Sequence, residues 1–175
     1  MKPISRLFIV VAGIAIASGA ATAQQIDDAK RTRNRVQLAQ LLDEVGPDVN
    51  IPFQRSTGQP YNYSGLLTTG LTHAESFDVV FGVSDVDTYM LKAYPKYKGG
   101  YVNVDKAKDP AALMRALLNL SFRTFLFWGI DNEGDVFVAY TFTLESGFPE
   151  EAIKVVLRSI VIHDKFFSEL RPLID

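Results

Sequence analysis

The sequence contains no cysteine, which excludes disulfide bonds, thiolate metal sites, iron–sulfur clusters and cysteine nucleophiles. Its two histidines, His73 and His163, are too few for a histidine-rich metal site. An excess of positive charge is also missing, because 18 Lys and Arg residues stand against 20 Asp and Glu residues. Since nucleic-acid-binding domains are normally strongly basic, this balance argues against a nucleic-acid partner.

Long apolar stretches are scarce, and the most prominent one lies near the N-terminus. Lys2 and Arg6 precede an apolar run from Leu7 to Ala17, and a small-x-small pattern ends at Ala23. This tripartite arrangement predicts a cleavable signal peptide over residues 1–23. We therefore expect one domain at residues 24–175, located in the bacterial periplasm or outside the cell.

An uncleaved membrane anchor is the alternative interpretation of the same segment. The apolar run is 11 residues long, whereas a helix that spans a membrane needs about 20. No cysteine follows the run, so a lipoprotein anchor is excluded. The sequence thus predicts no stable membrane span after cleavage, and an anchored regulator remains the competing hypothesis.

The first predicted helix has a basic beginning and an apolar continuation. Apolar residues from Val36 to Val45 recur at helical spacing, and Gly46-Pro47 ends the helix. We interpret the preceding basic cluster as the solvated start of this helix, with a partner or membrane-surface site as the alternative. The cluster consists of Lys30, Arg31, Arg33 and Arg35.

Two further helices are predicted from their first residues. Asp109 and Pro110 are typical of an N-cap and a first helical position, and the leucine-rich segment that follows is apolar over a wide arc. Pro149 opens the third helix, which runs for about 20 residues and is expected to end at Pro172.

Extended segments lie between these helices. The clearest strands are residues 76–83 and 87–94, with weaker candidates at 61–69 and 100–104. Six tyrosines concentrate in this region, which we attribute to strand packing rather than to a tyrosine-lined ligand site. The predicted fold class is α+β, an antiparallel sheet of about five strands flanked by three helices in the order α-β-β-β-α-β-β-α.

A hairpin over residues 122–144 is predicted from a three-residue loop, Asn132-Glu133-Gly134, with Gly134 at the position that needs a positive φ. This loop pairs Ile130 with Val136 and Trp128 with Val138, and extends the pairing to Leu126–Tyr140 and Thr124–Phe142. The opposite face of the hairpin is also apolar, which predicts an interaction surface, a homodimer seam, or a face covered by the second helix. The candidate partner-binding residues are Phe125, Phe127, Phe137, Ala139, Leu113 and Leu117.

The C-terminal half resembles the YbjN family and the related type III secretion chaperone-like fold. The resemblance is carried by LLNLSFRTFLFWGIDNEGDVFVAYTFTL (117–144) and FPEEAIKVVLRSI (148–160). It implies a non-catalytic protein that binds peptide or protein segments on apolar patches, often as a homodimer. The export signal departs from cytoplasmic secretion chaperones.

A search for catalytic groups finds no convincing constellation. His163 falls on the apolar stripe of the third helix and is interpreted as a packed histidine, and His73 as a loop residue. The hairpin-tip acids, Asp131, Glu133 and Asp135, fit an ordinary turn better than a calcium loop.

We therefore expect an exported, non-catalytic protein- or peptide-binding module, chaperone-like or regulatory, without cofactor or metal. The alternative is a small periplasmic hydrolase or carbohydrate-active enzyme that uses acidic residues in turns, Asp85 and Asp87 among them.

Overall fold

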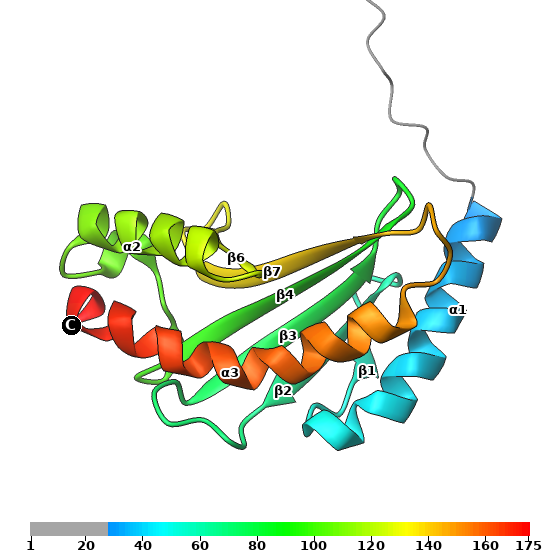
Figure 1. Cartoon of the computed structure of the whole chain (residues 1–175), viewed down its shortest axis with the longest axis horizontal. Coiled ribbons are helices and arrows are strands. Elements are labelled where there is room, and N and C mark those ends of the chain that lie inside the picture. The colour runs from blue at the N-terminus through cyan, green and yellow to red at the C-terminus, as the bar shows by residue number, and fades with distance from the viewer. Residues whose placement is uncertain (1–27) are drawn as a thin grey trace, which may run out of the picture.

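The computed structural model describes residues 28–175, so the predicted signal peptide at 1–23 lies outside the described residues. Three α-helices and seven strands form one α+β unit (Figure 1). The helices are α1 (Asp28–Val45), α2 (Pro110–Arg123) and α3 (Glu150–Ile174). The strands are β1 (Gln54–Arg55), β2 (Asn62–Leu67), β3 (Ser76–Val83), β4 (Thr88–Tyr97), β5 (Gly100–Tyr101), β6 (Phe127–Ile130) and β7 (Val136–Thr143).

The strands form one antiparallel sheet in the order β1-β2-β3-β4-β7-β6, with β5 paired to one end of β4. The expected fold class is confirmed. The sheet has seven strands rather than about five. The two-residue strand β5 falls within the weaker candidate at 100–104, whereas the two-residue strand β1 carries no recognisable pattern of alternation and has no predicted counterpart.

Helix α2 begins at the predicted cap, and α3 begins one residue after Pro149, which was expected to open it. The Asp109 side chain accepts a hydrogen bond from the backbone nitrogen of Ala112 at 2.9 Å, and Pro110 opens α2. In α3, Glu150 and Glu151 occupy the first turn, where carboxylates interact favourably with the helix dipole.

All three helices pack on one face of the sheet, and Figure 1 shows α3 lying across the strands. Strand side chains alternate between this face and the opposite one, so Tyr89, Leu91 and Ala93 of β4 are fully buried, whereas Met90 between them is exposed. The core thus lies between one face of the sheet and the three helices. Among the described residues, no helix is long and apolar enough to cross a bilayer.

The central hairpin has the register that the sequence predicts near its turn. Ile130 pairs with Val136 and Trp128 with Val138, and Gly134 has a φ of 80°. The continuation to Leu126–Tyr140 and Thr124–Phe142 is wrong. Helix α2 extends to Arg123, and Thr124 caps it by donating its backbone N–H to the carbonyl of Leu120, so β6 starts only at Phe127.

The expected end of α3 at Pro172 is also wrong, since the helix continues to Ile174. The carbonyls of Leu173 and Ile174 accept hydrogen bonds from the backbone nitrogens of Asp109 and Lys108. These contacts with the segment before α2 satisfy carbonyls of the last turn from outside the helix and stabilise the turn that continues past the proline.

Candidate binding surface on the open face of the sheet

The face of the sheet turned away from the helices carries an unusual mixture of aromatic, apolar and charged side chains. We call it the open face, because none of the helices described in residues 28–175 packs on it. Strand register places Leu66, Asp78, Val80, Met90, Lys92, Tyr94, Lys96, Tyr101, Phe127, Phe137 and Ala139 on this face.

Aromatic rings form a continuous row across the open face. The ring centroids of Phe127 and Phe137 lie 6.3 Å apart, those of Phe137 and Tyr94 5.8 Å, and those of Tyr94 and Tyr101 5.8 Å. Phe127 is 55% exposed, whereas Phe137 is nearly buried by its neighbours on the same face. The rings of the row are therefore packed against one another, although none of the three helices covers them.

Gly129 allows two of these rings to pack closely. A Cβ atom at this position would lie 2.6 Å from the Cε1 atom of Phe127 and 3.1 Å from the Cζ atom of Phe137. The two phenylalanine rings therefore occupy the space that a side chain on the edge strand β6 would otherwise fill.

A groove of about 690 Å³ continues from this row toward β1. Its floor comes from β2, β3 and β4, and its walls carry the rings of Phe53, Tyr94 and Tyr101. Three carboxylates and one ammonium group line it, which gives a formal charge of −2. These charged residues are Asp78, Asp131, Asp135 and Lys96.

Asp78 organises the middle of the groove. Its carboxylate accepts a hydrogen bond from the Tyr101 hydroxyl and forms an ion pair with Lys96 at 2.8 Å. The hydrogen bond to Asp78, together with burial, raises the pKa of Tyr101 to about 12. Burial and the neighbouring Asp131 carboxylate raise the pKa of Tyr94 to about 12. Both tyrosines thus stay protonated at neutral pH and present intact ring faces and hydroxyls.

Two lysines already place ammonium groups over rings of this face. The Lys92 Nζ lies 4.6 Å from the ring centroid of Phe137, and the Lys96 Nζ lies 5.1 Å from that of Tyr101. At these distances the ring quadrupole attracts a cation. The aromatic row therefore acts as a surface for ammonium groups within the protein itself.

The structure divides the six candidate residues predicted from sequence between two sides of the molecule. Phe127, Phe137 and Ala139 lie together on the open face. Leu113 and Leu117 are buried in the core on the opposite side, so the expectation that helix two joins or covers the apolar hairpin face is wrong. Helix α2 packs instead against α3 and the Trp128 side of β6, because its leucines face the main core.

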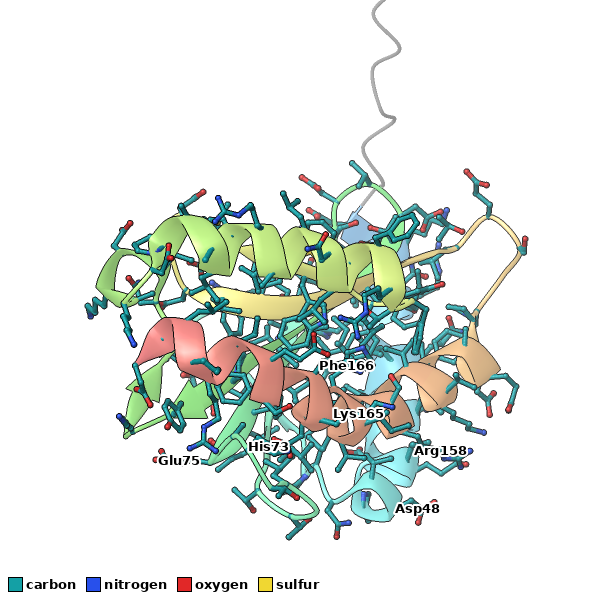
Figure 2. The ribbon with its side chains drawn as sticks, turned by 60° about the vertical axis from the view of Figure 1, so that its left-hand side comes forward. Asp48, His73, Glu75, Arg158, Lys165 and Phe166 are labelled. Carbon is teal, nitrogen blue, oxygen red and sulfur yellow. The ribbon has the colours of Figure 1, made fainter. Side chains whose placement is uncertain are left out.

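Phe125 is also displaced from the predicted patch. It lies in the connection between α2 and β6, and its ring contacts Tyr140 and His163, with centroids 6.2 and 5.9 Å away. His163 is buried, as predicted, and its Nδ1 lies 2.8 Å from the Ser159 carbonyl oxygen. Figure 2 shows Phe166 on the side of α3 that faces α2, where its ring centroid lies 5.6 Å from that of His163.

Helix α2 presents a second apolar feature to solvent. Met114, Leu118 and Phe122 recur at four-residue spacing, and Leu118 and Phe122 are 63% and 92% exposed. We call these three residues the α2 stripe. It lies on the helical side of the molecule, away from the open face.

The acidic turns have structural partners. Asp87 adopts a φ of 57°, pairs with Lys30, and accepts a hydrogen bond from the Asn34 side chain at 3.1 Å, while Asp85 is exposed in the same turn. Asp131 accepts hydrogen bonds from the backbone nitrogens of Glu133 and Asp135. These contacts join the β3–β4 turn to α1 and close the hairpin turn.

The basic cluster of α1 is less solvated than expected. Arg31 donates two hydrogen bonds to the Val83 carbonyl, at 2.8 and 3.1 Å, and stacks over the Tyr61 ring at 3.9 Å. Arg35 donates to the Pro60 carbonyl at 3.4 Å. These side chains hold α1 against the ends of β2 and β3, and only Arg33 of the cluster is fully exposed.

The groove residues Asp78, Tyr94, Lys96 and Tyr101 were not predicted from sequence. The available signal was the spacing of Lys92, Tyr94 and Lys96 at every second position, which places them on one face of a strand. That spacing does not reveal which face of the sheet the three helices α1, α2 and α3 cover.

Comparison with known proteins shows the fold alone. No family model and no curated protein sequence matches the chain. Among solved structures, the chain is similar to a chain in the crystal structure of the ExsC–ExsE complex, with 18% sequence identity and a TM-score of 0.50. The alignment covers 80% of this chain and 96% of that one.

Proposed function

We propose that this protein is an exported, non-catalytic binding module, chaperone-like or regulatory, that holds a segment of a protein partner on the open face of its sheet. The observation that supports this proposal most directly is the packed aromatic row, in which Phe127 remains 55% exposed on a sheet face that no helix of residues 28–175 covers. Packed but uncovered apolar surface of this kind marks interaction sites.

The comparisons support the same role at the level of the fold. The similar solved structure is a complex of two proteins, so the shared fold occurs in a protein assembly. The resemblance of residues 117–144 and 148–160 to YbjN-type proteins belongs to the same proposal. A non-catalytic role is further supported by Asp87 and Asp131, which serve turn and helix contacts.

Crosslinking in the native envelope fraction, followed by purification and mass spectrometry, tests this role. We expect a defined protein partner that is lost in a Phe127→Ser variant and retained in a Leu118→Ser variant. The two side chains are exposed to a similar extent, 55% and 63%, on different sides of the molecule. Equal recovery of the partner with both variants would contradict binding on the open face.

Export is a separate part of the proposal, supported by the tripartite pattern of residues 1–23. The intact mass of the protein recovered from cells measures it directly. Cleavage after Ala23 leaves Gln24 as the first residue, whereas the full mass would indicate the anchored alternative.

The α2 stripe supports a second interaction, a homodimer. Three large apolar side chains at four-residue spacing make an exposed helix face that a second copy can cover. Sedimentation of the wild type against a Leu118→Asp, Phe122→Asp variant tests it. A folded variant that sediments as a monomer, from a dimeric wild type, is the expected result, and a monomeric wild type would contradict it.

A further inference from the structure

We propose that the segment held on the open face carries a lysine or arginine side chain in the groove and an aromatic or large aliphatic side chain at the Phe127–Phe137 end. This inference rests on the proposed function and adds the chemistry of the partner. It is argued from the dimensions of the face, its charge and the contacts that its own lysines make.

The dimensions favour an extended polypeptide. The face crosses six hydrogen-bonded strands from β1 to β6, and strands lie about 4.8 Å apart, so it is roughly 24 Å wide. At about 3.4 Å per residue, an extended chain of roughly seven residues covers that width. The row of rings and the groove follow one another along this direction.

The charge of the groove favours a basic side chain. Asp78, Asp131 and Asp135 exceed the single positive charge of Lys96 by two. An acidic segment would meet these carboxylates at close range, whereas an ammonium or guanidinium group would complement them. Aromatic walls add to this preference because ring faces attract cations.

The protein's own side chains demonstrate the required geometry. Lys96 contacts both the Asp78 carboxylate, at 2.8 Å, and the face of the Tyr101 ring, at 5.1 Å. A second cation beside Tyr94 would find the same combination, since the ring of Tyr94 lines the groove together with Asp131 and Asp135. The site is held in place by the hydrogen bond between Tyr101 and Asp78.

The spacing of the two side chains follows from the sheet. Phe127 on β6 and Asp78 on β3 are three strand spacings apart, which is roughly 14 Å, or about four residues of extended chain. We therefore expect an apolar residue and a basic residue three to five positions apart in the bound segment.

Selection from a random heptapeptide library against the full chain as recovered from cells tests this inference without assuming a sequence. We expect enrichment of Lys or Arg three to five positions from an aromatic or large aliphatic residue. Binding is then measured by NMR titration with two matched peptides that differ only by lysine or glutamate at the basic position. The lysine peptide should bind about tenfold more tightly, a difference of about 1.4 kcal/mol, because only lysine gains the cation–π contact and the charge pair in the groove.

Two variants separate the inference from the function on which it rests. An Asp78→Asn, Asp131→Asn variant keeps the size and shape of both side chains and one acceptor oxygen on each, removes both negative charges, and should reduce the tenfold preference to about twofold or less. A Phe127→Ser variant should weaken the binding of the lysine peptide and of the glutamate peptide by the same factor. If peptide binding depends on Phe127 but shows no preference for Lys or Arg at the basic position, the inference is overturned and the proposed function stands. If no selected peptide depends on Phe127 for its binding, both the inference and the proposed function are overturned.

Discussion

The carboxylate of Asp164, on α3, lies 2.7 Å from the backbone nitrogen of Ala74, in the loop that precedes β3. The same carboxylate accepts hydrogen bonds from the backbone nitrogens of Thr72 and His73. Asp164 is 3% exposed, so three successive N–H groups solvate a buried charge in place of water. One side chain thereby fixes the loop 70–75 against the middle of the longest helix.

Replacing Asp164 should destabilise the fold through this loop. Asp164→Asn retains one carbonyl acceptor for three donors and should cost about 2 kcal/mol, whereas Asp164→Ala leaves all three donors buried without the carboxylate and should cost more. Urea denaturation measures both changes. Amide exchange at residues 72–74 should accelerate in the same order, and unchanged exchange in the Ala variant would contradict this role.

Removing one buried hydroxyl should loosen α1. The Tyr89 hydroxyl donates to the Asn34 carbonyl at 2.8 Å, and burial raises the pKa of Tyr89 well above its usual value. We expect Tyr89→Phe to cost about 1 kcal/mol of unfolding free energy. Tyr101→Phe, which removes a more exposed hydroxyl from the open face, is the control and should cost less than about 0.5 kcal/mol. Equal effects in chemical denaturation would contradict the assignment.

Neighbouring leucines of α2 should respond very differently to truncation. Leu117 is 2% exposed in the core, and Leu118 is 63% exposed on the α2 stripe. Leu117→Ala should therefore cost about 2–5 kcal/mol, while Leu118→Ala should stay within about 0.5 kcal/mol in dilute monomer. Thermal unfolding of the two variants at low protein concentration makes the comparison. Similar losses would mean that the stripe belongs to the folded core.

Stability should fall as the pH is lowered from neutral, because of His163. Burial lowers the pKa of His163 below its usual value, although the hydrogen bond with the Ser159 carbonyl opposes this effect. The unfolded chain takes up a proton near pH 6.5, where the folded chain does not, so acidification favours unfolding below that pH. Urea midpoints at pH 7.5, 6.5 and 5.5 measure the loss.

A His163→Phe variant should be less sensitive to pH over this interval, even if its stability at pH 7.5 differs. His73→Gln is the matched control, because His73 lies below α3 in Figure 2, is only half-buried and lines a surface pocket, and the variant should keep the pH dependence of the wild type. If the His163→Phe variant retains the full pH dependence of stability, that dependence comes from titratable groups other than His163.

The elements that local chemistry encodes could be predicted from sequence. The Asp109–Pro110 start of α2 and the Gly134 turn depend on cap and turn preferences within a few residues, and both are confirmed. The end of α3 could not be predicted in this way, because the hydrogen bonds that hold the turn after Pro172 come from the Lys108–Asp109 segment, more than 60 residues away.

The candidate site was predictable only in part for a related reason. Alternation correctly placed Phe127, Phe137 and Ala139 on one face of the hairpin. It could not decide which face α2 would cover, because both faces of the hairpin and a wide arc of α2 are apolar. Trp128 sits fully buried beneath the helices, and the larger core on that side takes Leu113 and Leu117.

The open face and the α2 stripe lie on different sides of the sheet, and this placement determines how many partner segments a dimer could bind at once. In a dimer joined through α2, each copy would keep its own groove accessible, so association and capture of a segment would not compete. A partner with two suitable segments on a linker long enough to reach both grooves would gain avidity, since its second binding step becomes intramolecular. A partner with one segment would gain nothing, so the dimer would discriminate between partners by how many segments they carry.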